Sequence, residues 1–345
     1  MPSNLFRLYL RLLNLILDLL AKPCQTAPMR EPRDSTHLVK IEQAARILRD
    51  GHVVAMPTET VYGLAGDAAR DDAVLEIFET KARPRFNPLI VHCADLEMVQ
   101  RLALFPDLAQ KLADQFWPGP LTMVLPKRAD APVSDLVTAG LDTIAIRMPK
   151  HHLARELIAA AGFPVAAPSA NPSGKLSPTT AQHVLDGFEG RVPVVDGGPA
   201  EEGVESTIVA VSDDQLVLLR PGTIARAQLA EATNVPVLDP QDKTIKAPGM
   251  LLSHYAPNAA VRLNAVDCHG GEAALNFGAS GLESKHATLN LSSNGDLAEA
   301  ARNLFSLLRQ ADQQGVRTIA VAPIPVDGLG EAINDRLRRA AADRN

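Results

Sequence analysis

Three cations alternate along one short segment of the chain. Lys81, Arg83 and Arg85 precede an apolar stretch that begins at Leu89. Side chains two residues apart project to the same side of an extended chain, and Pro84 favours the extended conformation at Arg83. An arginine pairs two phosphate oxygens at once, whereas a lysine acts as a point charge. The spacing therefore predicts a row of cations suited to a triphosphate, and a solvated basic loop is the alternative explanation.

Two polar loops follow stretches that we expect to be buried strands. Residues 57–64 carry two threonines, a glutamate and a tyrosine, and residues 168–174 carry two serines and an asparagine. Open α/β sheets usually bind ligands beyond the carboxyl ends of their strands, and buried hydroxyl or carboxylate groups need partners. Backbone N–H groups in such loops attract anions. Both loops are candidates for a binding site, although ordinary turns contain the same residues.

Polar residues at other strand positions are weaker indications. Arg147 lies in an otherwise apolar stretch, where an arginine is rarely buried without a partner, so it should reach the surface or an anion. His92 ends a predicted strand, where a structural role is the commoner one. Ser206 precedes one predicted strand and Arg220 ends another. Each of these residues alone decides little.

The apolar pattern predicts the elements that would position these residues. Short buried strands alternate with helices, which indicates an α/β domain over residues 38–225, and consecutive late strands indicate a mixed sheet. Its predicted helices cover residues 39–50, 71–78, 96–104, 108–116, 152–161 and 179–188. Its predicted strands cover residues 53–56, 89–91, 121–125, 143–148, 165–167, 192–195, 207–211 and 216–219.

A second, smaller α/β domain is expected at residues 258–345. The prolines and glycine of residues 226–257 suggest an interdomain linker before it. Its predicted elements are strands at 261–263, 287–291 and 318–321 and helices at 297–308 and 331–341.

Residues 1–37 read as a leader outside both domains. Arg7, Arg11 and Asp18 interrupt its leucine-rich part, which falls short of the roughly 18 uninterrupted apolar residues of a membrane span. A dispensable leader, an interfacial helix and a wrongly assigned start codon with the true start at Met29 are the three interpretations. We favour the last, because residues 23–35 resemble a disordered linker.

Composition excludes several functions. The net charge of −6 argues against a protein that holds nucleic acid mainly by neutralising phosphates, and the 4% aromatic content argues against a stacking platform for single strands. Three cysteines without metal-ligand spacing fit a reducing cytoplasm and predict no zinc site. The phosphate-loop, dinucleotide, nucleophile-elbow and kinase motifs are absent from the sequence, so any nucleotide site must be built from other loops.

Taken together, these segments resemble the YrdC/Sua5 family of threonylcarbamoyl-adenylate synthases. The similarity covers about residues 38–225 and consists, in order, of P-T-E-T-V-Y-G-L, K-x-R-P followed by N-P-L, A-I-R-M-P, P-S-A-N-P-S-G, E-S-T-I and L-R-P-G. The stretch A-P-G-M-L-L-S-H-Y-A-P at 247–257, followed by a small α/β domain, is similar to the longer, two-domain Sua5 branch.

The resemblance implies a fold and a reaction. The fold would be a twisted mixed sheet with a large cationic cavity, plus a smaller Rossmann-like α/β domain. The activity would be that of a nucleotidyltransferase that forms threonylcarbamoyl-AMP and pyrophosphate from L-threonine, bicarbonate or CO2, and ATP, with Mg²⁺ as the phosphate counterion and no prosthetic group. The product would serve a downstream threonylcarbamoyl transferase complex that makes N6-threonylcarbamoyladenosine at position 37 of tRNAs reading ANN codons. A weak tRNA contact and no membrane association are expected.

The resemblance also implies the site residues. Lys81 and Arg83 match the catalytic pair, and no metal ligand is implied. The positions matching the ATP side are Lys81, Arg83, Asn87, Thr143, Ser169, Asn171, Ser177, Arg220, His254 and Tyr255. The positions matching the L-threonine side are Thr60, His92, Arg147 and Ser206. Leu251 and Leu252 stand where the family usually has a basic or aromatic residue, which weakens the expectation that the linker around His254 and Tyr255 folds over the cavity.

Two other functions remain as alternatives. An RNA-binding accessory factor would use the cationic cavity for RNA, against the acidic net charge. A carbamoyltransferase related to hydrogenase maturation proteins would share the domain, but those chains are longer and carry zinc-finger-type cysteine pairs, which this sequence lacks.

Overall fold

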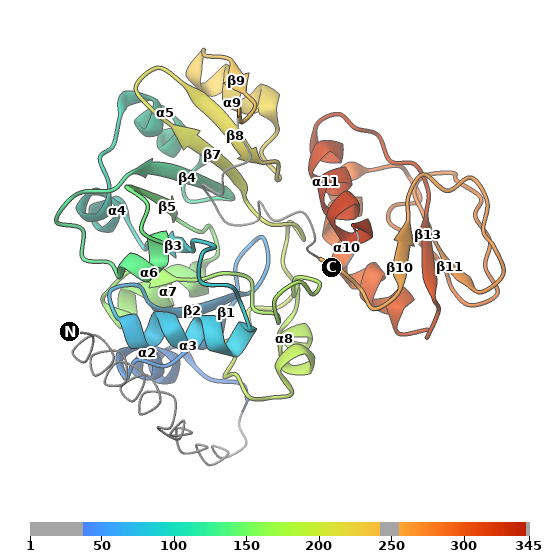
Figure 1. Ribbon diagram of the computed structural model, residues 1–345, viewed down its shortest axis with the longest axis horizontal. Coiled ribbons are helices and arrows are strands. Elements are labelled where there is room, and N and C mark those ends of the chain that lie inside the picture. Colours follow the sequence, from blue (N-terminus) through green and yellow to red (C-terminus); the bar gives the residue numbers. More distant parts are fainter. Residues whose placement is uncertain (1–36, 242–254, 343–345) are drawn as a thin grey trace, which may run out of the picture. The chain divides into compact units, whose positions relative to one another are not determined.

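A nine-stranded mixed sheet organises the first part of the chain (Figure 1). The computed structural model describes residues 37–241 and 255–342, and both ranges belong to the same unit of tertiary contacts. The strands occur in the order β1-β2-β6-β3-β5-β4-β7-β8-β9. They are Val54–Met56 (β1), Gly63–Asp67 (β2), Ile90–His92 (β3), Leu121–Pro126 (β4), Thr143–Arg147 (β5), Val165–Ala166 (β6), Thr207–Val211 (β7), Leu216–Arg220 (β8) and Val237–Leu238 (β9).

This sheet contains both parallel and antiparallel strand pairs. The pairs β3·β5, β4·β7 and β8·β9 are parallel, and the other neighbours are antiparallel, which confirms the predicted mixed sheet. The connecting helices are Ile41–Arg49 (α2), Asp71–Lys81 (α3), Leu96–Leu102 (α4), Asp107–Phe116 (α5), Asp135–Thr138 (α6), His152–Ala161 (α7), Ala181–Phe188 (α8) and Arg226–Thr233 (α9).

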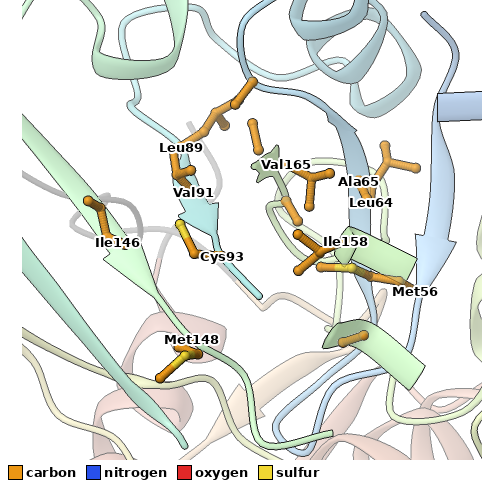
Figure 2. Close-up of a cluster of buried hydrophobic side chains, with 14 of the residues drawn as sticks. Met56, Leu64, Ala65, Leu89, Val91, Cys93, Ile146, Met148, Ile158 and Val165 are labelled. Carbon is orange, nitrogen blue, oxygen red and sulfur yellow. The ribbon is translucent and has the colours of Figure 1, made fainter. Parts of the chain in front are cut away.

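The two faces of the central strands meet different surroundings. Val91, Met123, Ile146 and Val209 belong to the large core that also contains the apolar faces of the helices. Figure 2 shows part of this core, which includes Val91 and Ile146 from β3 and β5 and Ile158 of α7. Burial of these side chains is the main favourable term in forming the sheet.

The opposite face carries a small apolar cluster and then polar residues. Ile90, Val124, Ala145, Ile208 and Leu219 form this cluster, and its members come from strands alone. Side chains alternate along a strand, so residues two positions apart share a face. His92, two positions after Ile90, and Arg147, two positions after Ala145, therefore lie on this face too. The strand ends therefore present polar side chains to the side of the sheet that the main core does not occupy.

A four-stranded parallel sheet organises residues 255–342. Its order is β10-β13-β11-β12. The core contains the apolar faces of both helices together with Tyr255. Its elements are Ala260–Arg262 (β10), Glu272–Asn276 (β11), Thr288–Asn290 (β12), Leu297–Asp312 (α10), Thr318–Val321 (β13) and Leu329–Ala341 (α11).

Four expectations about these elements were wrong. Strand β2 begins inside the expected loop 57–64, because its pairing with β1 and β6 outweighs the low strand preference of its glycines. The expected strand 192–195 forms only isolated bridges through Val194.

Residues 226–238 form α9 and β9 instead of a linker, since β9 pairs with β8. Strand β11 was missed because polar Glu272 and Asn276 end a short buried run.

The remaining predictions for the termini and the linker lie outside the described residues. These are the leader interpretations for residues 1–36 and the behaviour of residues 242–254. Among the helices of residues 37–241 and 255–342, none has both the length and the apolar character needed to cross a membrane.

Candidate active site

One cavity gathers most of the predicted site residues. It encloses about 50 Å³ of space. Its walls come from the loop after β1, the ends of β3, β5 and β8, and the loops 167–169 and 205–206. Arg83 and Tyr255 complete the walls. The lining residues are Thr58, Thr60, Val61, Gly63, Arg83, Ile90, His92, Arg147, Ala167, Pro168, Ser169, Glu205, Ser206, Arg220 and Tyr255.

Strand register brings the polar residues of the cavity together. His92 of β3 pairs with Arg147 of β5, and Arg147 pairs with Thr122 of β4. The Thr122 hydroxyl lies 2.8 Å from the Ser206 hydroxyl, which fixes the start of β7 beside the same row. These residues are far apart in the sequence, and only the sheet aligns them.

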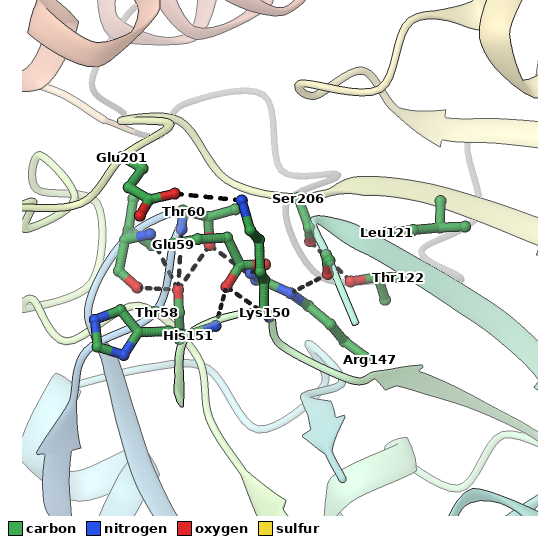
Figure 3. A network of polar contacts seen from close by, with 12 residues as sticks. Thr58, Glu59, Thr60, Leu121, Thr122, Arg147, Lys150, His151, Glu201 and Ser206 are labelled. Atoms are coloured by element: carbon green, nitrogen blue, oxygen red, sulfur yellow. Dashed lines mark hydrogen bonds and ion pairs between the residues drawn. The ribbon is translucent and has the colours of Figure 1, made fainter. Parts of the chain in front are cut away.

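Arg147 forms a buried ion pair that Figure 3 shows. Its Nη2 donates to Glu59 Oε1 at 2.7 Å, its Nη1 to the Thr60 hydroxyl at 2.8 Å, and its Nε to the Gly119 carbonyl at 3.2 Å. The side chains of Arg147 and Glu59 are 4% and 1% exposed, so each charge depends on the other. Arg147 was expected to reach either the surface or an anion, and Glu59 supplies an anion from within the protein.

Glu59 is held as a carboxylate. Burial alone raises its pKa, but the charge and hydrogen bond of Arg147 outweigh this effect and lower the pKa below its usual value. Its Oε2 also accepts from the backbone N–H of Lys150 at 3.1 Å and of His151 at 3.4 Å. Thr58 and Thr60 share a hydrogen bond of 2.8 Å in the same loop. The polar residues of residues 57–64 therefore form a satisfied network that orients Arg147.

Arg83 and Arg220 are two further buried cations of the cavity. Arg220 donates from Nε and Nη2 to the Ser206 carbonyl at 3.1 and 3.0 Å, and from Nη2 to the Ser206 hydroxyl at 3.1 Å. Arg83 donates to the Pro88 carbonyl at 3.1 Å, while its buried Nε has no hydrogen-bond partner. Burial lowers the pKa of each guanidinium to about 10, and each lowering includes a smaller contribution from a neighbouring arginine. Two nearby buried cations favour binding of an anion between them.

Lys81 is not among the residues that line the cavity. It is the last residue of α3, and its Nζ donates to the carbonyls of Ser169 and Asn171, each at 2.5 Å. Burial, with a smaller contribution from Arg83, lowers its pKa well below the usual value. Lys81 therefore holds the loop 168–174, whose Ser169 lines the cavity.

The predicted row of three cations is wrong. Lys81 is helical, Ala82 adopts the left-handed conformation, and Arg85 is exposed. The chain thus turns where an extended segment was expected, and Arg83 is the member of the three that lines the cavity.

His92 is a neutral member of the cavity wall. It is 3% exposed, and burial together with Arg147 lowers its pKa to about 3. Its Nδ1 lies 3.3 Å from the Ile90 carbonyl, and because a carbonyl only accepts, this nitrogen carries the proton. The other ring nitrogen is then an acceptor.

Several predicted residues lie outside the cavity lining. Asn87 and Asn171 are buried, and the side-chain oxygen of each has no hydrogen-bond partner. Thr143 starts β5, four residues before Arg147, and thus about 13 Å along the strand. Ser177 is buried and donates to Glu205. His254 is not among the described residues, whereas Tyr255 lines the cavity.

Two buried carboxylates at the site, of which Glu205 lines the cavity, were not among the predicted site residues. Glu59 and Glu205 are neighbours of predicted residues in the motifs P-T-E-T and E-S-T-I. Their place within these two motifs was the signal that could have identified them. Their partners, Arg147 and Arg336, lie 88 and 131 residues away, and the sequence gives no indication of either pairing.

Gly222 keeps the Arg220 loop against the start of β7. A side-chain carbon at this position would lie 2.2 Å from the Thr207 nitrogen and 2.6 Å from the Ser206 carbonyl carbon. We expect Gly222→Ala to destabilise the protein by about 1–3 kcal/mol, because the backbone would have to move apart. Thermal unfolding measures this loss, and Gly281→Ala, where an added side-chain carbon meets nothing within 4 Å and φ is not positive, is the comparison.

The comparisons with known proteins agree with this geometry. A family model named for Sua5, YciO and YrdC and described as "Telomere recombination" matches residues 46–222, and a model of the threonylcarbamoyl-AMP synthase C-terminal domain matches residues 224–342. A threonylcarbamoyl-AMP synthase of Bacillus subtilis is 42% identical, over 90% of this chain and 95% of the relative. The chain belongs to the threonylcarbamoyl-AMP synthase family.

Further members of the family extend the similarity. The threonylcarbamoyl-AMP synthase of Pyrococcus abyssi is 41% identical over 88% of this chain and 95% of the relative. A crystal structure of P. abyssi Sua5 complexed with L-threonine superposes with a TM-score of 0.79 at 39% identity, over 88% of this chain and 96% of that one. The family membership covers both sheets, so the predicted two-part α/β fold is confirmed.

Proposed function

We propose that this protein forms threonylcarbamoyl-AMP and pyrophosphate from L-threonine, bicarbonate or CO2, and ATP. The supporting observation is the convergence of Arg83, Arg147 and Arg220 on one buried cavity. Family membership supports the same reaction. In reaction class the protein would be a nucleotidyltransferase, because it transfers the AMP part of ATP.

The proposed reaction joins two anions. The amine of L-threonine attacks CO2 and loses a proton, which gives a carbamate. A carbamate oxygen then attacks the α-phosphorus of ATP, and the bond from that phosphorus to the pyrophosphate oxygen breaks. Charge repulsion opposes this approach, and fixed cations in a poorly hydrated site reduce it without reorganising. Holding both reactants in one cavity adds a proximity effect.

The residues of the site would bind different chemical groups of the two substrates. Arg83 and Arg220 would hold phosphate oxygens, since both are buried and Arg83 Nε has no hydrogen-bond partner. Arg147 and Thr60 would hold the carboxylate of L-threonine, with Glu59 keeping the guanidinium in place. His92 would accept a hydrogen bond from the amine or hydroxyl, because its ring is neutral. Lys81 would act indirectly by holding the loop of Ser169.

Nucleotide binding requires the cavity to open. The enclosed space of about 50 Å³ is smaller than the roughly 300–1,000 Å³ of usual ligand pockets. Tyr255 closes part of the wall and directly follows the undescribed linker. We infer that Tyr255 moves as ATP enters, with Asn87, Thr143, Asn171 and Ser177 near the path of the nucleotide, and the ATP contact expected of His254 stays a prediction.

The proposal extends to cofactor, compartment and partners. Mg²⁺ would enter as the counterion of ATP; in the described part of the chain, no group of three histidine, cysteine or acidic side chains could hold a metal. The cytoplasm would be the compartment, since Cys93 and Cys268 are free thiols. A threonylcarbamoyl transferase acting on tRNA would consume the product, and a weak tRNA contact would accompany the transfer.

Mass spectrometry of the reaction products tests the proposal. Full-length protein incubated with ATP, Mg²⁺, L-threonine and ¹³C-bicarbonate should form labelled threonylcarbamoyl-AMP together with pyrophosphate. A product that requires carbamoyl phosphate instead would indicate a carbamoyltransferase. Salt-sensitive tRNA binding without any adenylate would indicate an RNA-binding accessory factor.

A further inference from the structure

Arg336 of α11 is a buried cation that reaches the wall of the cavity. It is 1% exposed, and its Nε donates to Glu205 Oε2 at 2.8 Å. Its Nη1 donates to the Pro221 carbonyl at 2.9 Å and to Asp335 at 2.8 Å. Its guanidinium also lies over the Tyr255 ring, 5.4 Å from the centroid. One side chain thus contacts three segments that border the cavity.

Glu205 is a permanent negative charge in a cavity suited to anions. It lines the cavity, is 6% exposed and accepts a further hydrogen bond from Ser177. Burial alone raises its pKa, but Arg336 and Arg220 outweigh burial and hold the pKa at about 2. A carboxylate at this position opposes phosphate binding unless another group neutralises it.

Arg220 is the other cation within electrostatic range of Glu205. In the described structure it forms no ion pair with that carboxylate and donates instead to Ser206. Arg336 forms the ion pair with the Glu205 carboxylate and also donates a hydrogen bond to the carbonyl of Pro221, the residue after Arg220. Removing Arg336 would leave Arg220 as the nearest partner for a buried carboxylate.

We propose that Arg336 is a positioning residue of the ATP site: by neutralising Glu205 and bracing Pro221, it keeps Arg220 available to the phosphates of ATP. This inference rests on the proposed function and deepens it, because it gives a helix of the carboxyl-terminal sheet a part in nucleotide binding. The L-threonine side should depend on Arg336 much less, since Arg147 is neutralised by Glu59.

Isothermal titration of the full-length protein with ATP and, separately, with L-threonine tests this role. Arg336→Met should weaken ATP binding by about tenfold or more, as expected when one partner of a buried charge pair is removed, while L-threonine binding changes little. Adding Glu205→Gln should restore most of the ATP affinity, because the amide carries no charge to compete for Arg220. Arg338→Met, an exposed position on the same helix, is the matched control.

The outcomes separate the inference from its alternatives. Equal loss of ATP and L-threonine binding in Arg336→Met, without recovery in the double variant, would mean that Arg336 only supports the fold and would overturn the inference. Unchanged ATP binding in Arg336→Met would overturn it too. Product formation by the wild-type protein is measured independently, so failure of the proposed reaction is recognised even when the affinities follow the expected pattern.

Discussion

Arg83→Ala should leave the fold intact and slow pyrophosphate release by about a hundredfold to a thousandfold, the scale of removing one charged donor from a preorganised site. Arg83 lines the cavity, its Nε has no hydrogen-bond partner, and its one close hydrogen bond goes to the Pro88 carbonyl. Because little of the protein depends on this guanidinium, its loss should affect the reaction far more than stability. Steady-state release of pyrophosphate and thermal unfolding are the two measurements.

Arg85→Ala is the matched control for this prediction. Arg85 lies two residues further along the same segment, but it is exposed. Its removal should change the rate by less than about threefold if the screened charges at the surface contribute little. Equal effects of the two substitutions would mean that the segment acts through its general charge, and the assignment of Arg83 to the phosphates would be wrong.

The contrast between Arg83 and Lys81 shows what the sequence could and could not predict. The helical period of residues 71–78 and the cationic spacing were both visible, but the point where the helix ends was not. Helix α3 continues to Lys81, and the left-handed Ala82 then redirects the chain. A difference of three residues in the helix end therefore separated two side chains that the pattern grouped together.

The large elements were predictable because their signals are local. Helices such as α7 and strands such as β5 follow from periodicity over adjacent residues, and their observed bounds are close to those expected. Strand β2 has no such signal, since its five residues G-L-A-G-D include two glycines and an aspartate. Its strand conformation comes from the partners on both sides, which a local pattern does not contain.

The pairing of buried charges was the least predictable part of the site. Arg147 was expected to reach the surface or meet an anion, but the sequence did not indicate that Glu59, 88 residues away, neutralises it. Arg336 lies within the predicted helix 331–341 and was not among the predicted site residues, yet it is buried against Glu205. Family resemblance identified the residues expected to touch ligands, whereas it said nothing about the residues that hold them in place.

The buried arginines around the cavity are stabilised in two different ways. Arg147 has Glu59, whereas Arg83 and Arg220 have mainly carbonyl and hydroxyl acceptors. The first arrangement favours a stable, oriented guanidinium, and the second leaves charge for an incoming anion. This division suits a reaction in which the single carboxylate of an amino acid and the highly charged phosphates of a nucleotide enter the same cavity.

The Glu59–Arg147 pair gives the largest expected effect on stability. Arg147→Ala should destabilise the protein by roughly 3–5 kcal/mol near pH 8, because a buried carboxylate is left without its partner. In the wild-type protein the pKa of Glu59 is lowered, so the pair stabilises the fold above the usual carboxyl pKa and this contribution is lost as the pH falls. In the variant, burial remains and Arg147 does not, so the pKa of Glu59 should be raised instead.

The pH dependence of thermal unfolding tests this change of sign. As the pH falls through the raised pKa, folded Arg147→Ala takes up a proton at Glu59 and no longer carries the cost of a buried charge. The gap in unfolding temperature between wild type and variant should therefore shrink from pH 8 to pH 5, and Glu59→Gln added to Arg147→Ala should make the gap nearly independent of pH. Lys150→Ala, which removes an exposed pair with Glu201 at 3.6 Å, should have little effect at either pH. An equally large gap at both pH values would show that Arg147 stabilises the fold through its packing and not by neutralising Glu59.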